Sequence, residues 1–325
     1  MTAPSTAAFD FEPRARALIA DYPDRLPLRA AAFIVTLYGD VVVPRGGTLW
    51  IGNVIEACAE VGISETLVRT AVSRLVAAGR LSGSKAGRRS FYSLTPAARD
   101  EFERAAEILY AAPDEPTVDH KAADDWTVVM AAGADGRPAV EALARQGFGL
   151  AAPGVALRPG GAAPATADVA PGLLVFQARL TGTTSQGTLK DLAAAAWDLP
   201  ALAAEYDGFV ALFSPIAAAL DDAGRGRLNG ALALAVRLLL VHAFRRTALR
   251  DPRLPATALP ADWSGRTARR LFGAVYRALS PDADDHVARR FVDGDGPVAV
   301  DAERLRRRLR NLSETGDRPI GRMAS

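Results

Sequence analysis

Cysteine and histidine are both scarce in this sequence. It contains one cysteine, Cys58, and three histidines, His120, His242 and His286. A single thiol excludes a disulfide within the chain, and histidines so far apart in the sequence argue against a zinc site. Cys58 lies among apolar residues at helical spacing, which favours a small buried side chain over a reactive thiol. We therefore expect no metal centre.

Long apolar runs and a strong overall charge are also missing. The longest apolar run, residues 231–244, is too short to cross a bilayer and is interrupted by Arg237 and His242. Residues 1–12 lack the basic start and apolar centre of a secretory signal. The net charge of the 325 residues is only +2, which excludes a general binder of polyanions. These absences predict a cytoplasmic protein without a membrane partner.

The motifs of several common catalytic classes are absent as well. No Gly-Lys-Ser motif follows an expected strand, and the glycine pair Gly46 and Gly47 belongs to a turn. The sequence also lacks a G-x-S-x-G elbow. We therefore predict no catalytic residues and no cofactor.

Residues 64–78 have the pattern of an amphipathic helix. Ser64 is suited to the N-cap because its hydroxyl can accept a first-turn amide, and Gly79 suits the left-handed residue that ends many helices. Apolar residues recur at helical spacing and predict one buried stripe: Leu67, Val68, Ala71, Val72, Leu75 and Val76. The opposite face is polar and carries Glu65, Thr66, Arg69, Thr70, Ser73 and Arg74.

Two short strands, residues 80–83 and 89–94, are predicted to follow this helix around a basic loop. Between Gly62 and Ser93 there are six Lys or Arg residues and one acid, a local balance of 6 − 1 = +5. The six cations are Arg69, Arg74, Arg80, Lys85, Arg88 and Arg89. Such a local excess of positive charge suits contact with phosphates.

An amphipathic helix with a basic outer face is often only a solvated surface helix. Here a second apolar-periodic helix is expected over residues 48–59, and it leads through a glycine-containing turn into residues 64–78. Two such helices fit a helix-turn-helix, and the hairpin adds a wing. Arg45 lies in the turn at residues 44–47, where a guanidinium either reaches a phosphate or is solvated. The candidate DNA-binding residues are Arg45, Ser64, Thr66, Arg69, Thr70, Ser73, Arg74, Lys85, Arg88 and Arg89.

Residues 29–94 resemble the N-terminal domain of the PaaX family, the repressors of phenylacetic acid catabolism. The most distinctive segments of this resemblance are 36–40, 44–47, 67–70 and 87–92. The PaaX C-terminal domain is similar to segments 197–199, 240–246, 251–255 and 259–265, so the resemblance extends over residues 29–280. It implies an acyl-CoA effector, phenylacetyl-CoA in the named family. Such a ligand needs cations for its phosphates and an apolar slot for its acyl end.

The expected fold class is multidomain α+β. We expect an N-terminal arm at 1–28, loosely held over 1–12 and with a short helix at 14–19, before a winged helix DNA-binding domain at 29–110. That domain starts with a helix at 28–38 and ends with one at 96–110, which Thr95 caps and Pro96 opens. A linker at 111–116 leads to a ferredoxin-like middle domain at 117–182, and a helical C-terminal effector and dimerisation domain follows at 188–325.

The middle domain is expected to contain strands at 126–131, 148–150 and 173–178, a helix at 138–145 and a flexible loop at 159–171. In PaaX-like proteins this region resembles a small CRISPR-associated nuclease subunit. The first strand has no carboxylate in its interior, since Asp124, Asp125 and Asp135 lie outside it. A structural or dimerising role is therefore favoured over an enzymatic one. The helices expected after it are 189–198, 200–220 with a break at Pro215, 228–249, 266–279 and 299–312.

The candidate effector site is built from cations and aromatic rings. His242, Arg245 and Arg246 fall within little more than one helical turn, and His242 shares a face with Arg246. The apolar walls are expected from Trp197, Tyr206 and Trp263. The alternative is that these rings belong to the core and that His242 hydrogen-bonds a backbone carbonyl.

The C-terminal segment 304–310 carries five arginines. It either touches DNA or forms a solvated helix face paired with Asp301 and Glu303.

Together these observations predict a homodimeric repressor that binds double-stranded operator DNA and releases it when an acyl-CoA binds. One alternative is a nucleic-acid-processing enzyme that uses the middle domain. Another keeps the regulator and changes the effector to a free aromatic acid.

Overall fold

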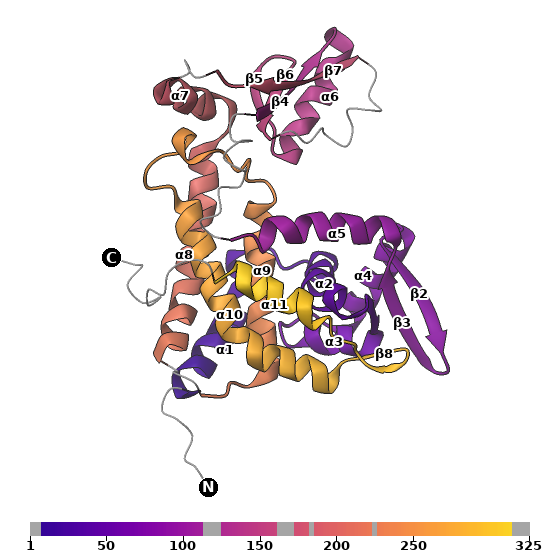
Figure 1. The fold of residues 1–325 in the computed structure, drawn as a ribbon. Coiled ribbons are helices and arrows are strands. Elements are labelled where there is room, and N and C mark those ends of the chain that lie inside the picture. The colour runs from indigo at the N-terminus through magenta and orange to yellow at the C-terminus, as the bar shows by residue number, and fades with distance from the viewer. Residues whose placement is uncertain (1–7, 113–124, 161–171, 182–184, 223–225, 314–325) are drawn as a thin grey trace. The chain divides into compact units, whose positions relative to one another are not determined.

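A computed structural model describes residues 8–112, 125–160, 172–181, 185–222 and 226–313 (Figure 1). The chain mixes helices with small sheets and divides into two compact units. We call Met1–Pro113 with Phe209–Arg245 and Thr267–Ser325 the N-terminal unit, and Asp114–Gly208 with Arg246–Arg266 the middle unit. The division differs from the expected ranges 29–110, 117–182 and 188–325, because the helices of the last range contribute to both units. The predicted linker at 111–116 and loop at 159–171 lie mostly outside the described residues.

Helix α1 (Ala8–Arg25) is longer than the sequence pattern predicts. Its Phe11, Ala15, Leu18 and Tyr22 are buried, and their spacing of four, three and four residues forms one apolar helix face. The expectation of a loosely held arm was wrong for residues 8–12, because burial of Phe11 holds the first turns in place. Residues 1–7 lie outside the described part of the chain.

The next elements begin with α2 (Ala30–Leu37), a π-helical turn (Tyr38–Val42) and a 3-10 turn (Val43–Arg45). Gly46 and Gly47 follow with φ of 86° and 85°, a conformation that side chains disfavour. The chain continues through β1 (Thr48–Trp50), α3 (Ile51–Ala59) and α4 (Glu65–Ala77). The predicted helix at 48–59 was wrong over its first three residues. They form β1, because Trp50 and Leu49 pair with the middle strand of the sheet.

Strands β2 (Leu81–Ala86) and β3 (Arg89–Leu94) form the predicted hairpin. With β1 they make a three-stranded antiparallel sheet in the order β1-β3-β2. Helix α5 (Pro96–Leu109) follows, and the hydroxyl of Thr95 accepts a hydrogen bond from the amide of Ala98 at 3.3 Å. The predicted cap and proline start are therefore confirmed.

The later helices are α8 (Leu199–Asp222), α9 (Gly230–Ala248), α10 (Ser264–Arg290) and α11 (Ala302–Asn311), with the short strands β8 (Val292–Asp293) and β9 (Gly296–Pro297). The expected break at Pro215 and the expected end at residue 279 were both wrong, because α8 and α10 run through Pro215 and Pro281. A proline inside a helix costs about 3 kcal/mol. Packing offsets this cost, since the neighbouring Phe213, Ile216 and Ala283 are buried.

Helix α8 is the one described helix that is long and apolar enough to cross a membrane by length and composition alone. A core helix of a soluble protein has the same length and composition. Buried side chains lie along α8, among them Tyr206, Phe209, Phe213 and Leu220.

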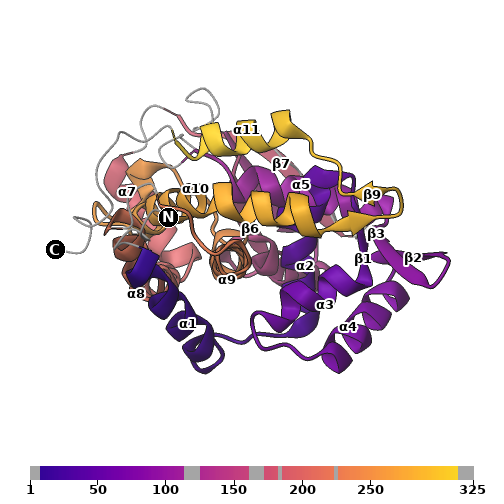
Figure 2. The same ribbon diagram turned by 90° about the horizontal axis from the view of Figure 1, so that it is seen from below.

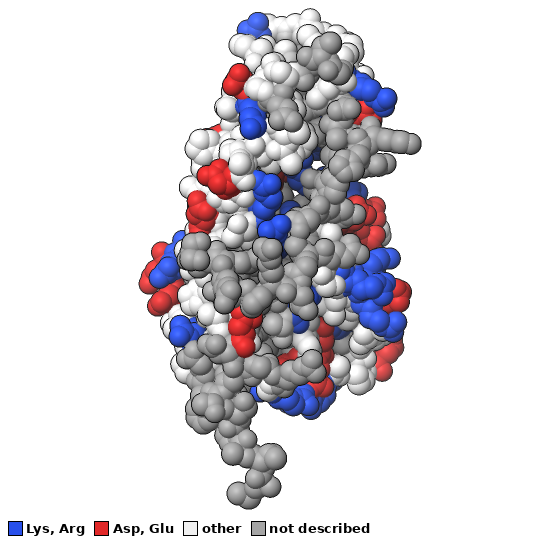
Figure 3. Space-filling view, turned by 60° about the vertical axis from the view of Figure 1, so that its left-hand side comes forward, with Lys and Arg blue, Asp and Glu red and all other residues white. Residues whose placement is uncertain are grey.

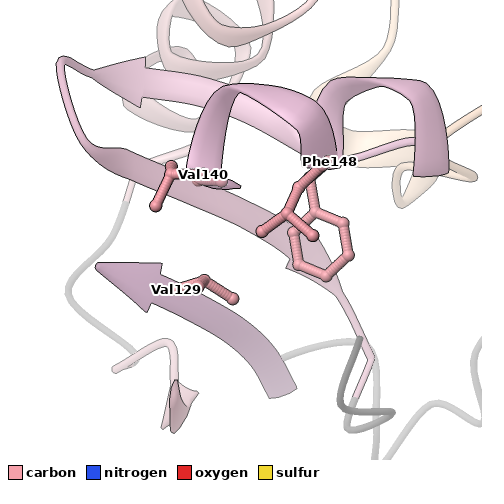
Figure 4. Packing of buried hydrophobic residues seen from close by; sticks show 5 residues of the cluster. Val129, Val140 and Phe148 are labelled. Carbon is pink, nitrogen blue, oxygen red and sulfur yellow. The ribbon is translucent and has the colours of Figure 1, made fainter. Parts of the chain in front are cut away.

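The middle unit contains β4 (Asp125–Ala131), α6 (Arg137–Ala142), β5 (Gly149–Ala152), β6 (Val155–Pro159), β7 (Leu173–Arg179) and α7 (Gln186–Ala196). Its sheet has the order β5-β6-β4-β7, with every neighbouring pair antiparallel. Val129, Val140 and Phe148 pack together with Leu143 and Ala156 in a small core (Figure 4). Strand β6 was missed in the sequence, because its five residues show too short a pattern to separate from a loop.

A buried carboxylate joins distant parts of the N-terminal unit. Asp40 is almost fully buried and lies 3.1 Å from the guanidinium nitrogens of both Arg237 on α9 and Arg308 on α11. The hydroxyls of Tyr110 and Tyr276 each donate to Asp40 Oδ1 at 2.8 Å. Figure 1 and Figure 2 show α10 and α11 beside each other in this unit.

These partners keep Asp40 charged. Burial alone would raise the pKa of Asp40, but the charges of Arg237 and Arg308 and the two tyrosine hydrogen bonds hold it below its usual value. Because the folded pKa lies below the unfolded pKa of about 3.9, this carboxylate stabilises the fold above that pH. The stabilisation is lost as the pH falls through the folded pKa.

We expect Asp40→Asn to lower the free energy of unfolding by about 3–5 kcal/mol, because it leaves two buried guanidinium groups without their shared anion. Urea unfolding at neutral pH measures this change. Glu303→Gln is the control, since Glu303 pairs with Arg310 at the exposed surface of α11 and its loss should leave the unfolding midpoint unchanged. Equal stability of Asp40→Asn and the native protein would contradict this role.

Candidate nucleic-acid interface

Helix α4 buries one face and exposes another. Val68, Ala71, Val72 and Leu75 are buried, and the helix packs against α2 and α3. The predicted stripe was wrong at its two flanks, because Leu67 is 56% exposed and Val76 is 38% exposed. The candidate DNA-binding residues on the other face are all exposed: Thr66, Arg69, Thr70, Ser73 and Arg74.

Contacts within α4 arrange part of its exposed face. Ser64 occupies the N-cap position, but its side chain makes no capping hydrogen bond, so only the position was predicted correctly. Arg69 pairs with Glu65 at 2.7 Å, one turn earlier on the helix. Thr70 donates its hydroxyl hydrogen to the carbonyl of Thr66 at 2.9 Å, one turn earlier on the helix.

The β2–β3 hairpin extends away from the other elements of the N-terminal unit (Figure 1). Lys85, Arg88 and Arg89 are exposed on it, and Gly87 in the turn has a φ of 60°. The guanidinium of Arg89 lies 4.9 Å from the centre of the Trp50 ring on β1, a cation–π contact that directs this arginine. Trp50 was not singled out in the sequence, since its role depends on β1 being a strand.

Arg80, the remaining cation of this region, is half-buried. Arg80 pairs with Glu101 on α5 at 2.8 Å and lies over the ring of Phe102. The positive surface is therefore made mainly by α4 and the hairpin. On the face seen in Figure 3, basic and acidic side chains lie interspersed, which agrees with a net charge of only +2.

Arg45 is corrected from a candidate phosphate contact to a structural residue. Its side chain is 1% exposed, donates to the carbonyl of Val41 at 3.0 Å and pairs with Asp284 on α10 at 2.7 Å. Asp284 also pairs with Arg237 at 2.8 Å, which connects Arg45 to the Asp40 network. A guanidinium held in this way is not available to DNA.

The arginines of helix α11 also include both exposed and buried side chains. Arg306 and Arg310 pair with Glu303, and the side chain of Asp301 caps the helix, as the solvated alternative predicts. Arg308 does not follow that pattern. It is buried against Asp40, with its guanidinium carbon 3.8 Å from the Tyr110 ring centre.

The candidate effector residues fall into two groups. Four of them lie in the middle unit: Trp197, Tyr206, Arg246 and Trp263. Tyr206 and Trp263 are buried in edge-to-face contact, with ring centres 6.0 Å apart, and the Tyr206 hydroxyl donates to Asp251 at 2.6 Å. Trp197 is half-buried and donates to the carbonyl of Gly147, while Arg246 is exposed.

His242 and Arg245 belong to the N-terminal unit, where α9 packs against α2. The imidazole Nδ1 lies 2.9 Å from the Thr36 hydroxyl oxygen, and the ring contacts Tyr22 and Phe33. Arg245 donates to the carbonyl of Ala32 at 3.3 Å. The predicted pairing of His242 with Arg246 around a ligand is therefore corrected, because α9 directs the imidazole into a packed core.

Metal chemistry is not indicated by the described residues. Within them, no group of three or more His, Cys, Asp or Glu side chains is close enough to hold a metal ion. Cys58 is buried, and burial raises the pKa of its thiol to about 12. Such a thiol is inert at neutral pH.

Comparison with known proteins identifies the family. Residues 29–98 match the model of PaaX-like proteins, and residues 197–289 match that of the PaaX-like C-terminal domain. The transcriptional repressor PaaX of Escherichia coli (strain K12) is 33% identical over 284 residues, which cover 85% of this chain and 86% of the repressor. The chain belongs to the PaaX-like family.

Solved structures are also among the matches. The uncharacterized protein Rv0674 from Mycobacterium tuberculosis is 24% identical, with a TM-score of 0.46 over 78% of this chain and 95% of that chain. The family relation to a transcriptional repressor, which is a regulator and not an enzyme, supports the non-enzymatic prediction.

Arg45 and Arg88 should behave differently when each is replaced by alanine. Arg45→Ala should lower the melting temperature, because it removes a buried partner of Asp284. Arg88→Ala should leave the melting temperature unchanged, weaken binding to all DNA sequences about equally and reduce the salt slope by about one unit. Melting curves and DNA titrations over a salt series measure both effects. A stable Arg45→Ala protein whose DNA binding has a reduced salt slope would show instead that Arg45 contacts phosphate.

Proposed function

We propose that this PaaX-like protein is a cytoplasmic transcriptional repressor that binds operator DNA through a winged helix at residues 29–110. In this proposal, α3 and α4 form the helix-turn-helix, and the β2–β3 hairpin is the wing. The observation that carries it is the exposed polar face of α4 beside the basic hairpin, both held on a buried framework. The family relation supports the same function.

The proposed contacts divide by chemistry. Thr66, Arg69, Thr70 and Ser73 are assigned to base edges, because residues of a recognition helix reach into the major groove. The phosphate contacts are assigned to Ser64, Arg74, Lys85, Arg88 and Arg89. The Glu65–Arg69 pair does not oppose this assignment, since both side chains are more than half exposed and an exposed ion pair contributes about 1 kcal/mol or less.

The middle unit is proposed to join two copies of the chain. Strand β6 lies between β4 and β5, which α6 connects, and this split βαβ arrangement supports a ferredoxin-like fold at 117–182. Strand β7 ends the sheet order, so one side of its backbone lacks a strand neighbour within the described residues. It also exposes Leu174, Val175 and Phe176. Antiparallel pairing of two β7 strands would cover this edge and generate a two-fold axis.

Footprinting should reveal an inverted repeat with half-sites about 34 Å apart, because two-fold dimers place two recognition helices at that spacing.

Phe176→Lys should convert the dimer to a monomer and weaken operator binding, since it places a charge in the proposed contact. Leu150→Lys is the matched control, because Leu150 is 36% exposed on β5 at the opposite edge of the sheet. Sedimentation measures the oligomeric state. A native monomer bound to an undivided half-site would contradict the dimer.

The effector is proposed to be an acyl-CoA such as phenylacetyl-CoA, bound in the C-terminal region by residues of the middle unit. Arg246 is exposed on α9, and the Tyr206 and Trp263 rings lie near the segment that follows this helix. An exposed cation and aromatic rings in the same unit suit an anionic ligand with an apolar end. A free aromatic acid also combines an anionic group with an apolar end, so the test compares both kinds of ligand.

Arg246→Ala should leave operator affinity unchanged and raise the effector concentration needed for release by roughly 10- to 100-fold, the loss expected of a charged hydrogen bond. The operator must in turn weaken effector binding by the factor by which the effector weakens operator binding. Titration of labelled operator with phenylacetyl-CoA and with phenylacetate measures these quantities.

Arg250→Ala is the control for loss of a nearby positive charge, because Arg250 pairs with Glu205 on α8 at the protein surface. Since this ion pair is largely exposed, the variant should leave both the melting temperature and the effector response close to native. A stable Arg246→Ala protein with the native effector response would exclude Arg246 from the site.

A further inference from the structure

Leu67 is an apolar residue of α4 that lies at the surface of the isolated protein. Its side chain is 56% exposed, although Val68 and Ala71 on the same helix are buried. Successive residues of an α-helix are rotated by about 100°, so Leu67 stands at the border between the buried face and the polar face. Thr70 and Arg74, three and seven residues later, lie next to it on the helix surface.

Exposure of a single leucine does not by itself assign a function, because isolated apolar residues are common on protein surfaces. The surroundings of Leu67 are more informative. It is the third residue of α4, and the exposed cations Arg74, Lys85, Arg88 and Arg89 belong to the same helix and the adjoining hairpin. Few acids balance these cations, since Glu65 is the one acid between residues 62 and 93.

A partner of such a surface must combine negative charge with an apolar group that one leucine can reach. The major groove of DNA offers both, because phosphates line its edges and the C5 methyl group of thymine projects into it. The N-terminal residues of a recognition helix are those that contact base edges. Leu67 lies in this N-terminal part.

We infer that Leu67 contacts the C5 methyl group of a thymine in the operator and thereby contributes to sequence selectivity. This inference rests on the proposed function, in which α4 enters the major groove. It adds an apolar contact to the hydrogen-bonding contacts assigned to Arg69 and the neighbouring hydroxyls. The thymine is recognised by its methyl group and not by its hydrogen-bonding pattern.

The test replaces each thymine of the operator in turn with deoxyuridine, which removes the methyl group and leaves the base pairing intact. For the native protein, one replacement in each half-site should weaken binding about three- to five-fold, the effect expected when one buried methyl group is lost. For Leu67→Ala, that same replacement should have no effect. The native operator should also bind Leu67→Ala more weakly, with the melting temperature of the protein unchanged.

Val76→Ala is the matched control. Val76 is also a partly exposed apolar residue of α4, but it lies nine residues further along, about 13 Å away at the helical rise of about 1.5 Å per residue. This variant should keep the full sensitivity to deoxyuridine. Equal sensitivity of Leu67→Ala and the native protein would overturn the inference, as would a loss of dimer in Leu67→Ala. Equal binding of the native protein to operator and random DNA would instead contradict the proposed function, and the inference would fail with it.

Discussion

The burial of Asp40 is the constraint on which the N-terminal unit depends. A carboxylate withdrawn from water must be surrounded by donors and cations, and here these come from the C-cap of α5 and from α9, α10 and α11. These partners come from distant parts of the chain, since Arg308 lies 268 residues from Asp40 in the sequence. One buried charge thus fixes how four helices meet the segment that follows α2.

The same network positions the surface assigned to DNA. Arg45, which follows Asp40 by little more than one turn, pairs with Asp284 and holds the chain where it enters β1. Tyr38 donates to the carbonyl of Tyr92 at 3.0 Å and so connects this segment to β3 of the hairpin. The exposed cations of α4 and the hairpin therefore stand on a framework whose own cations are buried and neutralised.

This separation between inner and outer arginines explains how a protein of small net charge presents a positive surface. Arg45, Arg237 and Arg308 are buried and compensated by Asp40 and Asp284. Their positive charges therefore add little to the field outside the protein. The field at α4 and the hairpin comes instead from side chains that remain in solvent, where salt screens their attraction to phosphate. Our proposal that DNA binding is salt-dependent follows from that exposure.

Local patterns along the chain were enough to predict α4 with its buried face, the β2–β3 hairpin, and the start of α5 at Thr95 and Pro96. Periodicity, capping and turn chemistry act over a few residues, so they can be read along the chain. Contacts between distant segments determine which arginines are buried, that His242 faces Thr36, and that Leu67 is exposed. These outcomes depend on segments as far as 268 residues apart. The residues next to an arginine in the sequence do not show whether its side chain will pair with a distant aspartate or remain in solvent.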